Sequence, residues 1–329
     1  MNIAQTASPY SSSDFLKIIE KTYRCRRVLL ETRTLVENIF YIQRSIFGKK
    51  LVNIPFSYYP RPPVDIPQEQ LLAELIKRAR SIGPKVYVLY KTMEPLDEIV
   101  VKAHDLQIMR STCISNLYLS GSKDEYWSKL SKNLRQNLRT SGRKIKDLGF
   151  IFEWSQNKKD LAIWYALHVR LYREKHGMIT QPLELFDSFI SASSGIGKLL
   201  LVKDGSGTIQ GGLFVLTGLS DWEYSWSAYN LTLQSLNLNT LLVEKMISDG
   251  FNQGVKKIGF GATPLSDEKL LYFKRRWLCE EKIAIHYYWN KKPTEIDLNK
   301  SGIILRKIYS RIPLFILKKI PRFIVPYLA

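Results

Sequence analysis

The chain has 329 residues and a strong basic excess, with 49 lysines and arginines against 30 aspartates and glutamates, or a formal net charge of +19. The length allows two domains of ordinary size, and an apolar content of 45% allows a proper core. The positive charge favours anionic partners, namely nucleic acid, anionic lipid or a phosphorylated substrate. The three cysteines, Cys25, Cys113 and Cys279, exclude a disulfide framework and a zinc motif because they lack paired spacing.

Targeting and membrane signals are absent from the sequence. The N-terminus is polar and serine-rich, without the apolar core of a signal peptide. No window approaches the roughly 20 apolar residues that span a bilayer. The four histidines show no metal-binding spacing with cysteines or carboxylates, so we expect no metal. These features predict a cytoplasmic protein.

The first half of the chain alternates between helical and strand patterns. Residues 51–56 read as a strand that leads into an aromatic and proline-rich segment at 57–63. Apolar residues recur with a helical period over 67–82, and 85–90 alternates as a strand. Residues 106–119 are predicted to form two strand pieces. This alternation indicates α/β layering rather than a helical bundle.

A strongly cationic helix is predicted at residues 122–148. Ser122 and Glu125 have the spacing of a capping box, and leucines recur every four residues from Leu130. A stripe of cations lies beside them, and it includes Arg135, Arg139 and Arg143. A solvated face remains the alternative to a binding surface. Exposed helices often carry glutamates four residues from their lysines and arginines, and this helix lacks them, which favours a surface that binds an anionic partner.

A second cycle of elements follows. The patterns predict two helices, a hairpin, a strand and a third helix, in that order, between a first strand and a last one. Their ranges are 150–154, 159–175, 183–190, 199–203, 209–217, 222–229, 240–252 and 280–289.

The stretch before the last strand carries the most specific pattern. Residues 257–260 read as a short strand in which Gly259, together with Gly261 just after it, leaves the backbone open to close approach. Ser266 is expected to cap a helix that delivers Tyr-Phe-Lys-Arg-Arg-Trp at 272–277. The three cations of this motif, Lys274, Arg275 and Arg276, suit the binding of an anionic ligand or the stabilisation of an oxyanion. The alternative is a buried Phe/Trp pair with solvated cations.

Gly-Phe-Gly followed by Tyr-Phe-Lys-Arg-Arg-Trp resembles the closing motif of the FemAB-like branch of the GNAT acyltransferase superfamily. The resemblance covers most of the chain from about residue 50, although prolines replace the family's glycines in the 57–63 loop. It implies an α/β (α+β) fold of two tandem GNAT-like domains with mixed central sheets flanked by helices. Residues 1–148 would form the N-terminal domain, whose completeness stays open, with 122–148 as the connecting helix. The acyltransferase domain would be 149–297, followed by a basic amphipathic tail at 298–329.

The resemblance also implies the site residues. Lys274 matches the family's Phe-Lys lysine, which would stabilise an oxyanion or bind a substrate phosphate, with Phe273 beside it. Further substrate-binding residues would come from the cationic helix, the 159–175 helix and the closing motif. They are Arg135, Arg139, Arg143, Arg170, Tyr172, Arg173, Arg275 and Trp277. We expect the cations of residues 129–146 and Lys274 to face one groove.

Donor binding is predicted at the start of the 240–252 helix and on the neighbouring strands. The residues are Tyr229, Asn239, Thr240, Gly259 and Gly261. A helix N-terminus binds phosphates, although simple capping also explains Asn239 and Thr240. The coenzyme A phosphate loop of GNAT enzymes is missing at 236–239. The donor therefore stays open between acyl-CoA and aminoacyl-tRNA, and neither would be a tightly bound cofactor.

The predicted function is transfer of an acyl or aminoacyl group to an amine or hydroxyl of a phosphate-bearing cell-envelope, peptidoglycan or polysaccharide precursor. tRNA would be a partner if the donor is aminoacylated. The alternative is a non-catalytic protein that keeps the GNAT fold and binds nucleic acid or a membrane surface. Residues 303–329 combine cations with apolar residues, which suits the anionic inner face of a membrane. Docking of this tail on the protein's own domains is equally compatible with the pattern.

Overall fold

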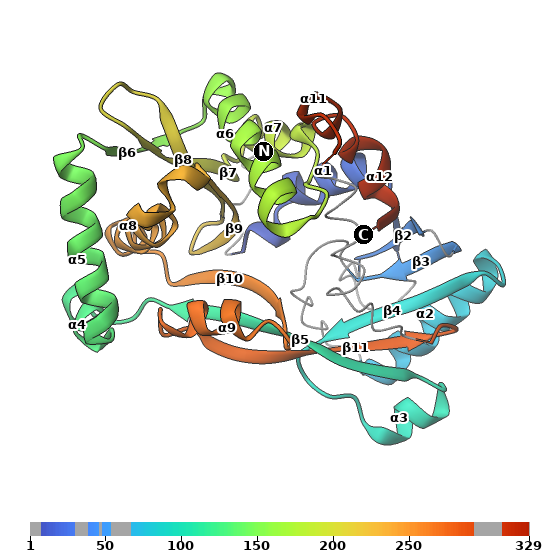
Figure 1. Ribbon diagram of the computed structural model, residues 1–329. Helices are drawn as coiled ribbons and strands as arrows, with labels where there is room; N and C mark the ends of the chain where they lie inside the picture. Colours follow the sequence, from blue (N-terminus) through green and yellow to red (C-terminus); the bar gives the residue numbers. More distant parts are fainter. Residues whose placement is uncertain (1–7, 30–38, 46–47, 54–66, 293–310, 329) are drawn as a thin grey trace.

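The computed structural model describes residues 8–29, 39–45, 48–53, 67–292 and 311–328 (Figure 1). Within these residues, eleven strands form one mixed sheet in the order β1-β2-β3-β4-β11-β5-β10-β9-β8-β7-β6. Helices flank this sheet, as predicted. The predicted proline-rich loop at 57–63 and the first part of the tail lie outside the described residues.

The first half of the chain supplies one end of the sheet. Its elements are α1 (Ser13–Tyr23), β1 (Arg26–Leu29), β2 (Ile39–Ser45), β3 (Gly48–Val52), α2 (Gln68–Ile82), β4 (Val86–Thr92), α3 (Glu98–Ala103) and β5 (Gln107–Tyr118). The prediction of two strand pieces at 106–119 was wrong, because β5 is continuous. The irregularity near residue 111 is a register shift against β11 rather than a break, since pairing resumes on either side of it.

The connecting segment is two helices rather than the single predicted one. They are α4 (Lys123–Lys129) and α5 (Lys132–Asp147). The Ser122–Glu125 capping box is present at the start of α4. The break occurs because Leu130 is extended and the Ser131 hydroxyl accepts from the Leu134 amide at 3.2 Å, which starts a new helix.

The second half supplies the other end of the sheet and the tail. Its elements are β6 (Ile151–Ser155), α6 (Lys158–Leu171), a π-helical turn η2 (Tyr172–His176), α7 (Leu183–Ile190), β7 (Gly197–Lys203), β8 (Ile209–Thr217), β9 (Asp221–Tyr229), η3 (Leu231–Leu236), α8 (Leu238–Asn252), β10 (Lys257–Pro264), α9 (Glu268–Arg275), β11 (Glu280–Trp289), α11 (Leu314–Leu317) and α12 (Pro321–Leu328). Asp267, not the predicted Ser266, caps α9.

The two halves meet at the centre of the sheet. β5 pairs antiparallel with β10 on one side and with β11 on the other, so strands of both predicted domains belong to one sheet. β9 and β10 are parallel, but the described ladder between them ends at Glu223 and Gly259. Next to that point the rings of Tyr224 and Phe260 stack, with centroids 5.4 Å apart. The domain boundary at residue 148 stays a prediction.

Three clusters of buried side chains hold the fold together. One packs α1, α6, α7 and the tail on one face of the sheet, and a second packs α8 and α5 on the other face of its second half. The third packs α2 on β3 and β4. In the tail, α12 contacts β2 and α1 while α11 contacts α6, which confirms docking of residues 311–328 on the protein's own body.

Candidate functional site

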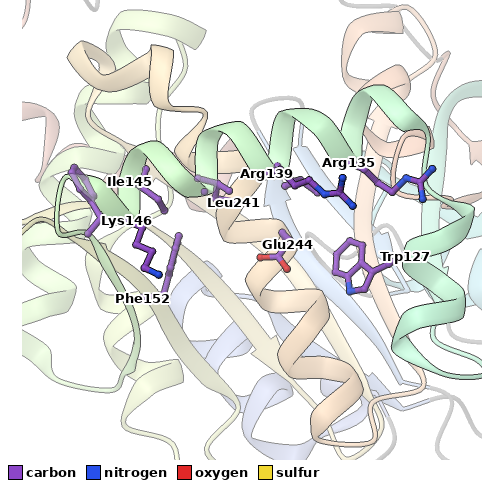
Figure 2. Close-up of a pocket in the computed structure, with 11 residues that line it drawn as sticks. Trp127, Arg135, Arg139, Ile145, Lys146, Phe152, Leu241 and Glu244 are labelled. Carbon is purple, nitrogen blue, oxygen red and sulfur yellow. The ribbon is translucent and has the colours of Figure 1, made fainter.

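A groove of ≈ 540 Å³ lies between the cationic helix α5 and helix α8, and we call it the α5 groove (Figure 2). Its apolar wall includes Trp127, Phe152 and Leu241. Arg135 and Arg139 extend toward the end that holds Trp127, and Lys146 lies at the opposite end beside Phe152. Among the described residues, none of these three cations is in an ion pair with a carboxylate. Such a groove suits a ligand that combines an apolar body with an anionic group.

One carboxyl group, that of Glu244 on α8, also lines the α5 groove. Burial raises its pKa, while a hydrogen bond from the Ser248 hydroxyl, 3.0 Å away, acts in the opposite direction. Glu244 is thus a half-buried groove residue rather than an exposed helix charge. Its position on the side of α8 that faces α5 could not be read from helical spacing alone.

A second groove of ≈ 680 Å³ lies along α5 beside the start of α8, and we call it the polar groove. Lys132, Lys144 and Asn237 are among its lining residues. Asn237 is the N-cap of α8 and donates from its side-chain amide to the Ser141 hydroxyl at 3.1 Å. Two lysines beside the N-terminus of a 15-residue helix favour a phosphate group. Asn239 and Thr240, predicted to begin this helix, lie in its first turn instead.

Three tyrosines, Tyr172, Tyr224 and Tyr229, form a cluster between the π-helical turn and α8. The Tyr224 hydroxyl lies within hydrogen-bond distance of the Ser227 hydroxyl, at 3.1 Å, and of the Asn239 side-chain oxygen, at 3.4 Å. Lys175 donates to the Tyr229 hydroxyl at 2.7 Å. Burial raises the pKa of Tyr172 to about 12 and also raises the pKa of Tyr224. Both phenols therefore stay protonated at neutral pH and can donate hydrogen bonds.

This tyrosine cluster brings together residues that the sequence assigned to different ligands. Tyr172 was predicted to touch the acceptor, whereas Tyr229 and Asn239 were predicted to touch the donor. The π-helical turn at 172–176 reorients the end of the predicted 159–175 helix, and π turns occur often at functional sites. Gly177 then ends the turn in the left-handed conformation, which favours glycine.

Lys274 lies in the interior and lines neither of the two grooves beside α5. Its side chain is 2% exposed, and its amine donates to the Gly261 carbonyl at 2.9 Å. Burial lowers the pKa of Lys274 to about 8, while the nearby Glu223 and Glu281 carboxylates act in the opposite direction. The expectation that Lys274 and the cations of residues 129–146 face one groove was wrong, because helix α9 directs this amine back onto β10.

The two glycines of β10 have internal roles in this structure. A Cβ atom at Gly259 would clash with the carboxylate of Glu223. The group that approaches this glycine closely is therefore Glu223 rather than the predicted donor. Gly261 has a φ of +69°, a conformation that favours glycine, and its carbonyl accepts from Lys274. Neither glycine lines a groove described above.

Several predicted substrate-binding arginines contact groups of the protein instead. Arg170 pairs with Glu174, Arg173 donates to the Ile312 carbonyl of the tail, and Arg275 pairs with Glu281. Arg143 lies on α5 but lines neither groove beside it.

Trp277 and Phe273 belong to the core cluster beneath α8, in a T-shaped contact with ring centroids 6.5 Å apart. The Tyr126 hydroxyl donates to the Trp277 carbonyl at 3.0 Å. Trp277 is therefore buried, as the alternative of a Phe/Trp pair predicted, but Phe273 is half-buried and Lys274 is buried rather than solvated.

Sequence reasoning missed Trp127 and Glu244 as groove residues. Trp127 precedes the break between α4 and α5, and Glu244 lies more than a hundred residues further along the chain, so no local spacing connects them. Within the described residues, no group of His, Cys, Asp and Glu could hold a metal ion. Among the described helices, none combines the length and apolar character needed to cross a bilayer.

Comparison with known proteins identifies the fold. Residues 132–275 match the family described as "Acetyltransferase (GNAT) domain". The structure is similar to that of FemX, with a TM-score of 0.64 and 13% identity over 88% of this chain and 94% of that one. It is also similar to L-PGS from Bacillus licheniformis, with a TM-score of 0.58 and 13% identity over 90% and 93% of the two chains.

A third similar structure is the C-terminal domain of a putative lysylphosphatidylglycerol synthetase from Agrobacterium fabrum. Its TM-score is 0.57, with 12% identity over 92% of this chain and 90% of that one. No curated protein matches the sequence. The likeness to FemX and the match to a GNAT domain confirm the resemblance that the closing motif carried.

Proposed function

We propose that this protein is an acyl- or aminoacyltransferase, because residues 132–275 match a GNAT acetyltransferase domain and the fold is similar to that of FemX. Its acceptor would carry a phosphate and the amine or hydroxyl that receives the acyl group. A cell-envelope, peptidoglycan or polysaccharide precursor has this chemistry. The observation that carries the proposal is the placement of α5, whose cations line a groove on each of two sides within the matched domain.

The polar groove is the proposed site for the phosphates of the donor. Positive charge is supplied there by Lys132, Lys144 and the first amides of α8. The tyrosine cluster lies nearby, since Tyr224 contacts Asn239 in the first turn of α8. Both acyl-CoA and aminoacyl-tRNA carry phosphates, so a phosphate-binding groove fits either donor. The departure from the usual coenzyme A loop at 236–239 keeps aminoacyl-tRNA in the proposal.

The α5 groove is the proposed site for the phosphate-bearing acceptor. Arg135 and Arg139 can hold a phosphate through paired N–H donors, and the aromatic wall can cover an apolar or sugar portion. Transfer requires attack of the acceptor amine or hydroxyl on the acyl carbonyl and stabilisation of the oxyanion. The bond from the acyl group to the donor then breaks, and the departing CoA thiol or tRNA hydroxyl takes up the proton that the acceptor loses. The protonated phenols of the tyrosine cluster are candidate donors to that oxyanion. A direct role of Lys274 requires its amine to leave the Gly261 carbonyl.

The test is transfer of label from acetyl-CoA and, separately, from aminoacyl-tRNA to a pool of phosphate-bearing envelope precursors. We expect one donor to support transfer, and Arg139→Gln to raise the KM for the acceptor by roughly tenfold or more, as loss of a charged hydrogen bond implies. Lys132→Gln should raise the KM for the donor. Arg143→Gln is the matched control, because it removes a cation from the same helix outside both grooves.

The alternative function is binding of nucleic acid without catalysis, which the net charge of +19 favours. Absence of transfer from either donor, together with salt-sensitive and sequence-blind binding to duplex DNA, would support it and overturn the proposal. Binding of tRNA that requires a charged 3′ end would instead support the transferase.

A further inference from the structure

The described tail, residues 311–328, has two faces of different character. Its inner face anchors it to the protein, since Leu317 and Val325 are 7% and 5% exposed and belong to the core cluster that also holds Phe15 and Tyr41. Its outer face carries large apolar side chains that the protein leaves in solvent. Phe315 is 67% exposed and Phe323 is 56% exposed, and Ile316 lies beside Phe315 in the chain.

The cations of the tail lie among these exposed apolar residues. Lys318, Lys319 and Arg322 are all exposed, and the sequence contains no aspartate or glutamate after Asp297. Arg322 makes a long ion pair with Glu184 at 3.8 Å, in which both side chains remain more than half exposed. We call Phe315, Ile316, Lys318, Lys319, Arg322 and Phe323 the tail outer face.

Exposed aromatics beside lysines are typical of surfaces that lie in a lipid–water interface. The aromatic rings enter the boundary between headgroups and acyl chains, and the cations stay at the level of the lipid phosphates. Nucleic acid would use the cations but leave Phe315 and Phe323 without a role unless bases were unstacked onto them. Lys318 and Lys319 lie between α11 and α12, and Arg322 lies beside Phe323, so each exposed aromatic has a cation near it in the chain. Such pairs fit the level at which lipid phosphates meet acyl chains.

The position of the tail fits such a contact. α11 and α12 lie at the periphery of the molecule, outside α1 and β2 (Figure 1). The inner face remains on the core, so the contact requires no unfolding of the tail. The sequence of the tail left two alternatives open, namely docking on the protein and contact with a membrane. Both can hold at once, because one face of the helices would dock on the protein and the other would contact the membrane.

We propose that the tail outer face docks this protein peripherally on a membrane surface that contains anionic lipid. The inference rests on the exposed side chains of residues 311–328 and is independent of transferase activity.

The experiment is flotation of the full-length protein with vesicles of phosphatidylcholine alone or mixed with phosphatidylglycerol. We expect binding to the mixed vesicles only, and a decrease in binding as salt is added. The double variants Phe315→Ser/Phe323→Ser and Lys318→Gln/Lys319→Gln should each bind roughly tenfold more weakly. Both pairs are exposed, so the variants should fold, and thermal unfolding of each checks this.

The matched control is Ile99→Ser/Lys102→Gln on α3, which removes an exposed apolar residue and an exposed lysine far from the tail in the chain. It should bind as the unmodified protein does. Equal binding by the tail variants and the α3 variant would overturn the proposal, as would binding to phosphatidylcholine alone with the same affinity. Binding to duplex DNA in place of vesicles would assign the outer face to nucleic acid. None of these outcomes depends on whether transfer occurs.

Discussion

Lys274 was the residue that the sequence most clearly predicted to be catalytic. In the structure its amine points into the interior instead of into a groove. Its neighbours in the chain matched a family motif, but its amine is bound to a backbone carbonyl of β10. A lysine with a pKa near 8 is still mainly protonated at neutral pH, so it can supply positive charge where it lies. Its burial favours a role in positioning β10 unless that hydrogen bond opens during catalysis.

Replacement of Lys274 by alanine separates these roles. If the amine stabilises an oxyanion, Lys274→Ala should lower kcat by roughly 100-fold with little change in either KM. The measurement is steady-state kinetics, with thermal unfolding to report the folded fraction. Unchanged kcat per folded molecule would remove Lys274 from the mechanism and leave it a structural residue.

His168 on α6 provides a pH prediction at the same scale. Its ring is fully buried, stacked on Trp164 and in contact with Tyr172, and burial lowers its pKa from 6.5 to about 3. Between these two values the unfolded chain binds one more proton than the folded protein. The free energy of unfolding should therefore fall as the pH drops below about 6.5, by up to about 1.4 kcal/mol per pH unit.

Urea unfolding between pH 7 and pH 5 measures this dependence. His168→Phe keeps an aromatic ring in the stack and should weaken the fall in stability, whereas His104→Gln, at a half-buried position, should leave the fall attributed to His168 in place. Buried His286 adds a dependence of the same sign, because burial lowers its pKa to about 4. An unchanged pH dependence in His168→Phe would contradict the assignment.

At the scale of elements, helix α5 determines the two grooves, and Ser131 determines where α5 begins. The Ser131 hydroxyl satisfies the Leu134 amide, which has no partner within the helix backbone. Ser131→Ala should lower the free energy of unfolding by about 1 kcal/mol. The control is Ser131→Asp, which keeps a capping oxygen and should be about as stable as the unmodified protein. Equal stability of all three proteins in denaturant unfolding would show that the cap contributes nothing.

Local patterns predicted most elements because helix period, strand alternation and capping depend on residues a few positions apart. The capping box at Ser122, the end of α2 at Gly83 and the hairpin of β7 and β8 follow the prediction. The errors occurred where tertiary contacts override the local pattern. β5 remains continuous because β10 and β11 pair with it on both sides, and α4 ends early because Ser131 offers a competing cap.

At the scale of the whole molecule, the tail covers part of the first core cluster. Leu317 and Val325 lie in the cluster that contains Tyr41 and Phe15, and α12 packs on both β2 and α1. Removal of residues 311–329 should lower the melting temperature, since buried apolar contacts are lost on both sides of that interface. The double variant Phe315→Ser/Phe323→Ser alters only exposed residues and should melt as the unmodified protein does. An unchanged melting temperature after truncation would show that the tail adds no stability.

The order of most helices and strands, the basic character of α5 and the tail, and the family resemblance could be predicted before the structure was known, because each depends on residues close together in the chain. The direction of each cationic side chain depends on the tertiary structure. Arg170, Arg173 and Arg275 meet partners of the protein, Arg135 and Arg139 line a groove, and the amine of Lys274 turns inward. The physical reason is that an ionic side chain is directed by whichever oxygen or solvent it meets, and those partners come from distant parts of the chain.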